Sequence, residues 1–242
     1  MHVPVKLLFA RRIVLSTERL QNGATLYWAV EAFIEVENIA YEKRVVVRWR
    51  NVKCVDTEAT YLRSSGGNTE IWRAVSPTHS CWSNQGPGTE SIKFAIRYDV
   101  AGETHWDNNG GWDYSCACWN NDNSVVLGPN LLLKSAAVVQ GTGGEYLRGE
   151  IFVKNLDYAK RIDVIYTIDR WVHAQKVPAW FREEANAQVG HPNEVWEFSA
   201  PLGRQKDFSV EVRFALRYEV DGKAYWDDNV GLDYVLTKHV TL

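Results

Sequence analysis

A ten-residue motif whose side chains could bind a ligand occurs twice in the chain. Residues 225–234 read YWDDNVGLDY, and residues 105–114 read HWDNNGGWDY. An indole ring can stack on the C–H face of a pyranose, while carboxylate and amide groups pair with its hydroxyls. The motif therefore indicates sugar recognition. The candidate sugar-binding residues are Trp106, Asp107, Asn109, Tyr225, Trp226, Asp227 and Asn229.

The same motif has two other interpretations. Asp and Asn side chains bond their own backbone in tight turns, and a Tyr can fix the corner of a β-sandwich, so the residues could build a turn and nothing else. An oxygen-rich loop could also hold calcium, but these acids are fewer and closer together than in an Asp-x-Asp-x-Asp-Gly loop. Cys116-x-Cys118 is too tight for a zinc site. We predict no metal and no cofactor.

Catalysis is not predicted. A glycoside hydrolase needs two carboxylates about 5–10 Å apart. The adjacent pairs Asp227/Asp228 and Glu183/Glu184 do not provide this, because neighbouring side chains in a strand or turn usually point apart. The six His residues show no metal-ligand or nucleophile spacing. The chain is therefore expected not to be an enzyme.

Composition narrows the possible partners. The 242 residues carry 27 Lys+Arg against 30 Asp+Glu, which argues against nucleic acid as a partner. No apolar run is long enough to insert into a membrane. The first residues lack a secretory apolar stretch, so we expect a cytoplasmic protein, or a secreted one without a recognisable signal peptide. The cysteines are predicted to be four reduced thiols, with one disulfide as the alternative.

The chain is a duplication. Shifted by 120 positions, residues 94–114 match residues 214–234 at twelve of twenty-one positions. Residues 34–47 match at a shift of 117, and residues 4–14 match at a shift of 125. The shift changes between blocks, where loops tolerate insertions. A polar run at 120–124 marks the predicted boundary, giving domains 1–123 and 124–242.

The matched blocks read as β-strands. Apolar residues alternate with polar ones at 34–36, 45–47, 94–100 and 214–220, and Gly102 and Gly222 suit tight hairpins. Only residues 180–187 could form a short turn of helix. Trp72 and Trp196 are expected in the core. Many short strands separated by turn signals predict an all-β protein of two tandem antiparallel β-sandwiches.

The second half carries further motifs in a fixed order. These are KRIDV at 160–164, TIDRW at 167–171, WEF at 196–198 and RFALRY at 213–218, followed by the motif at 225–234. In this order they resemble the family-21 carbohydrate-binding module, found in starch-binding domains of some fungal glucoamylases and in glycogen-targeting subunits of a protein phosphatase. The resemblance implies immunoglobulin-like sandwiches that bind α-glucan without catalysis. It adds Trp171 and Trp180 to the candidate binding residues.

The sequence departs from the family pattern at two places. Cys54 matches Trp171, so the first half lacks one stacking platform. Its site is therefore either weaker or rebuilt from another aromatic residue. Asp113 and Asp233 replace the Asn that is usual in the family, which leaves the sugar open. The candidate replacement aromatics are Trp49, Trp72, Trp82 and Trp112.

We therefore expect a lectin-like, non-catalytic tandem protein that binds an oligo- or polysaccharide. The favoured ligand is α-glucan (starch or glycogen), and two modules would raise avidity by ~10²–10⁴. One alternative is a glycogen-targeting regulatory subunit of a protein phosphatase. Its docking pattern, basic-x-Val-x-Phe/Trp, has only a poor match at residues 43–49, where the spacing is wrong and the pattern is that of a buried strand. Another alternative is a lectin for galactose-type cell-surface glycans. Whether the protein has a protein partner is left open.

Overall fold

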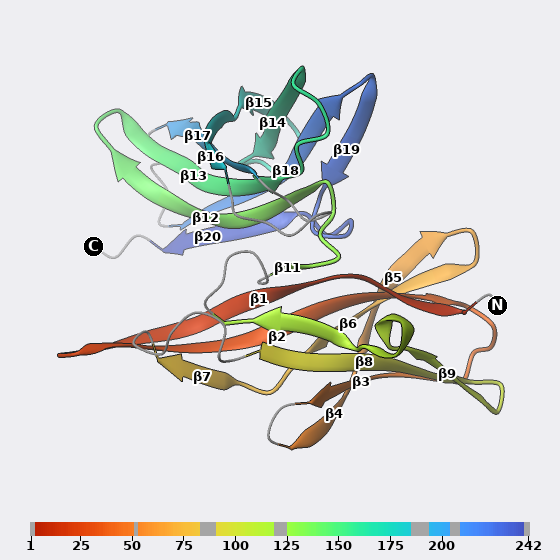
Figure 1. The fold of residues 1–242 in the computed structure, drawn as a ribbon. Coiled ribbons are helices and arrows are strands. Elements are labelled where there is room, and N and C mark those ends of the chain that lie inside the picture. The colour runs from red at the N-terminus through yellow and green to blue at the C-terminus, as the bar shows by residue number, and fades with distance from the viewer. Residues whose placement is uncertain are drawn as a thin grey trace. The chain divides into compact units, whose positions relative to one another are not determined.

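The chain folds into two compact units, Met1–Leu127 and Gly128–Leu242 (Figure 1). The computed structural model describes residues 3–50, 53–82, 91–118, 125–184, 194–203 and 209–239. The domain boundary expected at 120–124 lies outside the described residues. Each unit is built from two antiparallel β-sheets whose inner faces share one core, which confirms the all-β prediction. No helix among the described residues has the length and apolar character needed to cross a membrane.

The strands of the first unit are β1 (Val5–Leu20), β2 (Gly23–Glu37), β3 (Lys43–Arg50), β4 (Cys54–Glu58), β5 (Thr60–Gly66), β6 (Thr69–Val75), β7 (His79–Trp82), β8 (Ser91–Val100), β9 (Glu103–Asp107), β10 (Tyr114–Ala117) and β11 (Val125–Val126). One sheet has the order β11-β1-β2-β6-β5, with β7 also paired to β2. The other has the order β10-β8-β3-β4, with β9 also paired to β8. The 3₁₀ helix η1 (Asn109–Gly111) lies between β9 and β10.

The strands of the second unit are β12 (Leu131–Gly141), β13 (Gly144–Val153), β14 (Lys160–Thr167), β15 (Gln175–Pro178), β16 (Trp180–Glu184), β17 (Glu194–Gly203), β18 (Ser209–Val220), β19 (Lys223–Asp227) and β20 (Tyr234–His239). One sheet has the order β12-β13-β17-β16, and the other has the order β15-β14-β18-β19, with β20 also paired to β18.

Alternating apolar residues fill each core, but the two predicted core tryptophans lie at its margin. Trp72 and Trp196 are partly buried against the cores of their units. Each indole N–H donates to a carboxylate two residues earlier, that of Glu70 at 3.0 Å and that of Glu194 at 2.8 Å. These hydrogen bonds satisfy the one polar atom of each ring and so permit its partial burial.

The pairing of the first strand in each unit shows that the sequence match between the two units was one residue out. Leu7 pairs with Ile34, and Leu133 pairs with Ile151, with a β-bulge directly after each. The structural shift is therefore 126 rather than 125. The difference matters because a slip of one residue moves every side chain of a strand to the opposite face.

The predicted hairpins are present in the structure, whereas the predicted helical turn is not. Ala101 and Gly102 have φ of 52° and 80°, and Asp221 and Gly222 have φ of 48° and 67°, which confirms tight hairpins with left-handed central residues. The helical turn expected at 180–187 is wrong for its described part, because Trp180–Glu184 forms β16 and pairs with β17. Pairing with the next strand overrides the local preference there. Residues 185–187 lie outside the described residues.

A disulfide joins the two sheets of the first unit. Cys81 of β7 is bonded to Cys118, which follows β10, so the alternative of one disulfide is confirmed and the prediction of four reduced thiols is wrong. Cys54 is exposed and Cys116 is buried. Burial raises the pKa of the Cys116 thiol to about 12, which keeps it protonated.

Candidate functional site

Trp226 stands on the outer face of a sheet. It lies near the end of β19 and pairs with Arg217 of β18, and its side chain is 55% exposed. The Arg217 guanidinium carbon lies 5.6 Å from the centre of the indole ring, so a cation–π contact holds the ring in place. Strand alternation directs Tyr225 to the other face, where it packs against the core with its ring 5.9 Å from that of Tyr218. The structure therefore presents Trp226 to a ligand and separates Tyr225 from it.

Asp227 is buried and joins the two sheets of its unit. Its carboxylate accepts the Tyr234 hydroxyl at 2.8 and 2.9 Å and the backbone N–H of Leu133, in the opposite sheet, at 2.7 Å. That amide immediately precedes the β-bulge in β12. These bonds use lone pairs that the sequence analysis assigned to sugar hydroxyls. They support the turn-building interpretation for this residue.

Asp107 makes the same connection in the first unit. It accepts the Tyr114 hydroxyl at 2.8 and 2.9 Å and the Leu7 N–H at 2.7 Å. Burial and then the Asp107 carboxylate raise the pKa of Tyr114, so its hydroxyl stays protonated and donates. The repeat of Asp and Tyr in the two motifs thus preserves a bond between sheets.

The turn after each Asp is closed by side chains. Asn229 Nδ2 donates to the Asp233 carbonyl at 3.1 Å, and the Gly231 N–H donates to Asp228 Oδ1 at 2.7 Å. In the first unit, Asn109 Nδ2 donates to the Asp113 carbonyl at 3.2 Å. Each Asn is therefore a turn residue. The side-chain oxygen of Asn229 has no hydrogen-bond partner among the described residues, so it can still accept from a ligand.

The turn of the second unit contains a strained residue. Val230 has φ of 55°, whereas Gly110 occupies the same place in the first unit with φ of 66°. A β-branched residue is disfavoured in this left-handed region by roughly 1–3 kcal/mol. We expect Val230→Gly to stabilise the second unit by about 1 kcal/mol. This value is what remains of the relieved strain once the greater conformational entropy of glycine in the unfolded chain is subtracted. Urea unfolding measures this. Gly110→Val is the matched control and should destabilise the first unit, whereas a less stable Val230→Gly protein would contradict the account.

Trp171 is carried to the same end of this sheet by the loop after β14. Arg170 and Trp171 have φ of 56° and 69°. The Thr167 hydroxyl accepts the Trp171 backbone N–H at 3.1 Å and donates to Asp169 at 2.6 Å. This hydroxyl, followed by the His173 N–H and ring, lowers the pKa of Asp169 to about 2. Asp169 is thus ionised at neutral pH and keeps the loop closed.

The Trp171 indole connects this loop to the motif. Its Nε1–H donates to Asp233 Oδ2 at 2.7 Å, and Asp233 belongs to the turn that follows Trp226. The structure therefore brings Trp171, Asn229 and the Trp226 strand together. It does not bring Trp180 to them, because Trp180 lies on β16 in the other sheet of the unit.

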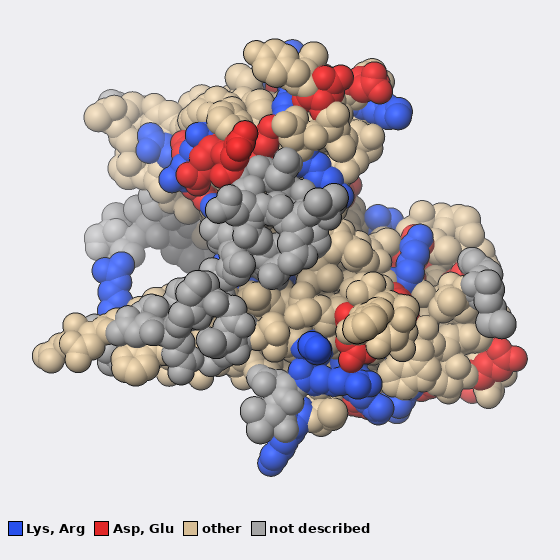
Figure 2. Space-filling view, in the orientation of Figure 1, with Lys and Arg blue, Asp and Glu red and all other residues tan. Residues whose placement is uncertain are grey.

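In the first unit the equivalent ring is less exposed, and the arginine over it comes from β3. Trp106 is 36% exposed, and the Arg48 guanidinium carbon lies 5.3 Å from the centre of its ring. Two hydrogen bonds of 2.8 and 2.9 Å to Asp56 fix Arg48 and raise its pKa. Ile165 is the second-unit counterpart of Arg48. Ile165 pairs with Ala215, and Arg48 pairs with Ala95, the residue that matches Ala215 in the first unit. Lys and Arg side chains gather over β3 and β8 (Figure 2).

The aromatic residues expected to rebuild the first site differ in exposure. Cys54 begins β4 and pairs with Arg50, so it does not lie in a loop like that of Trp171. Trp49 is 1% exposed and belongs to the core, and Trp72 is half-buried. Trp82 and Trp112 are exposed, and Trp112, in the turn beside Asp113, is 83% exposed. Of the four, Trp112 is best placed to replace the missing platform.

Two exposed tyrosines were not among the predicted binding residues. Tyr41 and Tyr158 occupy matched positions and are 98% and 97% exposed. Each precedes by two residues a buried lysine that bonds a glutamate, Lys43 to Glu70 at 2.9 Å and Lys160 to Glu194 at 2.6 Å. The sequence signal that could have identified them is their recurrence in the block repeated at a shift of 117. They give each unit another aromatic side chain at the surface.

Residues 10–117 and 127–237 each match the model of the carbohydrate/starch-binding module (family 21). A 126-residue region is 35% identical to protein phosphatase 1 regulatory subunit 3C of Xenopus tropicalis, covering 49% of this chain and 51% of that protein. Another region is 34% identical to glucoamylase 1 of Rhizopus oryzae, covering 46% of this chain and 19% of that protein. The matched region thus spans about half or less of these curated relatives.

A solved structure also matches. It is the starch binding domain of Rhizopus oryzae glucoamylase in complex with beta-cyclodextrin and maltoheptaose. That domain is 26% identical to this chain, and the match covers 45% of this chain and 93% of the domain, with a TM-score of 0.28.

Proposed function

Because the chain belongs to family 21 of the carbohydrate/starch-binding modules, with one match in each half, we propose that it is a non-catalytic tandem protein that binds α-glucan. The observation that carries this proposal is the half-exposed indole of Trp226 beside the Trp171 loop, which a 2.7 Å bond ties to the same turn. A half-exposed indole, held by the Arg217 guanidinium over its ring, is a rigid platform for a sugar ring.

The arrangement suits a weak, repeated contact. The Trp226 ring supplies stacking area, and the side-chain oxygen of Asn229 supplies an acceptor for a hydroxyl. Asp227 holds the strand end in place rather than meeting the sugar. Because one shallow platform binds weakly, two modules on one chain would raise avidity for a long polymer by ~10²–10⁴.

Asp233 is relevant to which sugar is bound. Its carboxylate accepts the Trp171 indole N–H, so it serves to orient that ring. The departure from the Asn usual in the family therefore has a structural use, and we infer that it leaves the preference for α-glucan in place. A galactose-type ligand is the outcome that would reverse this inference.

A panel of polysaccharides tests the proposal. In native gels containing glycogen or amylopectin, the full chain should migrate more slowly, and free maltoheptaose should restore its mobility. Galactan and cellulose serve as matched controls and should leave migration unchanged. Prolonged incubation should release no reducing sugar. Retardation by galactan alone would indicate the galactose-type lectin, and release of reducing sugar would indicate an enzyme.

A second candidate is a glycogen-targeting subunit of a protein phosphatase, which the names of the phosphatase relatives favour. The nearest docking-like string, however, lies within β3, where Val45, Val47 and Trp49 are at most 1% exposed. These buried side chains are not accessible to a phosphatase. A cytoplasmic location, as the sequence analysis expects, would suit this role. Co-purification with a phosphatase catalytic subunit distinguishes the two candidates.

A further inference from the structure

Basic side chains of β3 and β8 lie together on the outer face of the first unit, next to Trp106 (Figure 2). Arg50 pairs with Lys93, so their side chains are neighbours on one face of the sheet. Arg48 precedes Arg50 by two residues and therefore points to the same face. Arg50 is 49% exposed, and Lys93 is exposed. We call Arg48, Arg50 and Lys93 the basic cluster.

The carboxylates near the basic cluster do not balance its charge. Asp56 is held by Arg48 through two hydrogen bonds of 2.8 and 2.9 Å. Arg50 contacts Asp113 at 3.4 Å, its only ion pair with a described residue, and Lys93 has no ion pair within the described part of the chain. Because a guanidinium carries five N–H donors, Arg50 keeps most of them for an anionic ligand.

The second unit has uncharged residues where β3 carries the two arginines. Ile165 is the counterpart of Arg48, and Thr167 is the counterpart of Arg50. The Thr167 side chain is buried, and its hydrogen bonds close the loop that carries Trp171. The two arginines are therefore particular to the first unit, where β4 begins in place of such a loop.

The lysine of the basic cluster lacks the acidic neighbour that its counterpart has. Arg213 of β18 matches Lys93, and it forms an ion pair with Glu211 at 3.0 Å. Two residues before Lys93, β8 has Ser91 where β18 has Glu211. A bound anion would thus meet a carboxylate at this place in the second unit and a neutral serine in the first.

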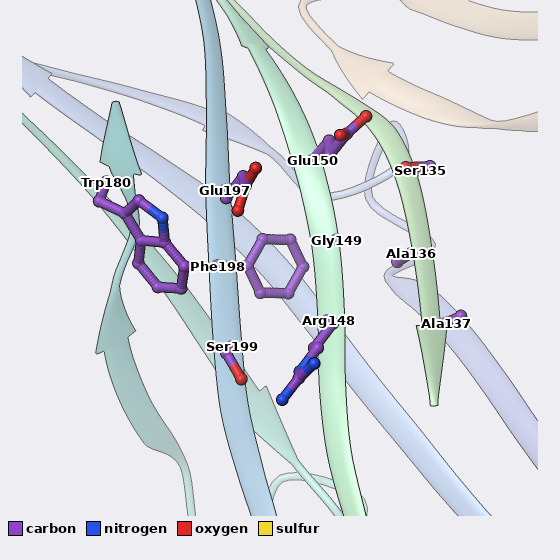
Figure 3. A pocket seen from close by; sticks show the side chains of 10 residues that line it. All are labelled: Ser135, Ala136, Ala137, Arg148, Gly149, Glu150, Trp180, Glu197, Phe198 and Ser199. Atoms are coloured by element: carbon purple, nitrogen blue, oxygen red, sulfur yellow. The ribbon is translucent and has the colours of Figure 1, made fainter. Parts of the chain in front are cut away.

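The groove on the other sheet of the second unit has a different charge balance. Figure 3 shows Arg148 in this groove of about 640 Å³, together with the carboxylates of Glu150 and Glu197. Arg182 of β16 forms ion pairs with both glutamates, at 3.0 Å with Glu197. The cations there are matched by carboxylates. An anionic ligand is therefore expected at the basic cluster rather than in this groove.

Exposed aromatic rings beside the basic cluster indicate what carries the anion. Trp112, in the turn that contains Asp113, is 83% exposed, and Trp106 is 36% exposed. An indole stacks on the C–H face of a sugar ring, while an arginine can pair with two oxygens of a phosphate at once. A lysine adds a point charge. The combination suits a sugar that carries a phosphate monoester, whose charge is close to −2 at neutral pH.

We propose that the first unit binds α-glucan that carries phosphate monoesters, with Arg50 and Lys93 on the phosphate and Trp112 on a glucose ring. The glucan part of this inference rests on the proposed function, and the phosphate part rests on the basic cluster. The second unit lacks the cluster and takes the neutral chain. The two units together would then bind phosphorylated and unmodified stretches of one polymer.

Calorimetric titration of the full chain with maltoheptaose phosphorylated at one C6 hydroxyl, and with unmodified maltoheptaose, tests this inference. We expect one site to bind the phosphorylated sugar roughly five- to tenfold more tightly than the unmodified one. Raising the salt to about 0.5 M should reduce this ratio, because the cations are solvent-exposed and screened.

Three variants locate the phosphate contact. In Arg50→Gln/Lys93→Gln the affinity ratio should fall to about one. Ser91→Glu introduces the carboxylate that the second unit has at Glu211, so it should lower the ratio without removing a cation, and it decides the matter if the double variant misfolds. Arg213→Gln, at the place that matches Lys93, is the control and should keep the native ratio.

The outcomes separate this inference from the proposed function. Equal affinity for the two sugars, or a ratio that stays native in both Arg50→Gln/Lys93→Gln and Ser91→Glu, overturns the phosphate site and leaves glucan binding in place. Competition by glucose 6-phosphate, inorganic phosphate or single-stranded RNA as strong as that by phosphorylated maltoheptaose also overturns it, because the occupant would not be a glucan. If the native chain takes up neither maltoheptaose, both proposals are overturned.

Discussion

Replacing Trp226 with alanine is expected to abolish α-glucan binding at the motif surface of the second unit. The side chain is outward-facing and 55% exposed, so its removal takes away the stacking platform while leaving the core intact. The fold loses only the cation–π contact with Arg217, about 0.5–1 kcal/mol at an exposed site. The melting temperature should therefore stay within a few degrees of the native value. Migration in glycogen gels and thermal unfolding measure the two effects.

Trp106→Ala is the matched control in the first unit. The Trp106 side chain is 36% exposed against 55% for Trp226, so we expect a smaller loss of binding than for Trp226→Ala. If Trp226→Ala unfolded the second unit, Trp226 would be a core residue and the site would be misplaced. If it bound glycogen normally, the ring would not be the platform.

The second large effect is expected on stability. Asp227→Ala should destabilise the second unit by about 3 kcal/mol or more, because it leaves the Tyr234 hydroxyl and the Leu133 N–H without their acceptor between the sheets. Asp228→Ala is the neighbouring control. It removes one hydrogen bond to the Gly231 N–H, so about 1 kcal/mol is expected. Urea unfolding followed by tryptophan fluorescence measures both values.

The same variant decides between two roles for the carboxylate. If Asp227 contacted the sugar instead of joining the sheets, Asp227→Ala would lose glucan binding while its free energy of unfolding stayed native. That result would contradict the structural role. Asp107→Ala should destabilise the first unit in the same way, because its carboxylate makes the same bonds to Tyr114 and Leu7.

Local signals made much of the fold predictable. The duplicated block, the alternation along 94–100 and 214–220 and the hairpin glycines all depend on residues close together in the chain. The register of the first strand left no such signal, and this strand was aligned one residue away from the observed match of Leu7 with Leu133. The strand at Trp180 was missed although its partner β17 is the next strand of the chain, because pairing with that strand overrides the local preference.

The roles of the motif residues were harder to predict than their positions. Leu7 lies 100 residues from Asp107, so the bond that buries this carboxylate cannot be seen in the motif itself. Trp106 and Trp226 occupy identical motif positions, yet the neighbouring strand places Arg48 beside one ring and Ile165 at the matching place near the other. Sequence identity within a motif thus fixes the turn, whereas the surrounding strands determine what the exposed ring can bind.

Two-dimensional NMR of the eleven tryptophan indole N–H groups, followed during titration with maltoheptaose, tests most directly whether exposed rings of the second unit hold α-glucan. The Trp226 signal, assigned with Trp226→Phe, should shift and saturate together with that of Trp171. The signals of the buried Trp28 and Trp49 should stay in place. A Trp226 signal that does not move at saturating maltoheptaose, or that moves equally with a galactose oligomer, would contradict the account.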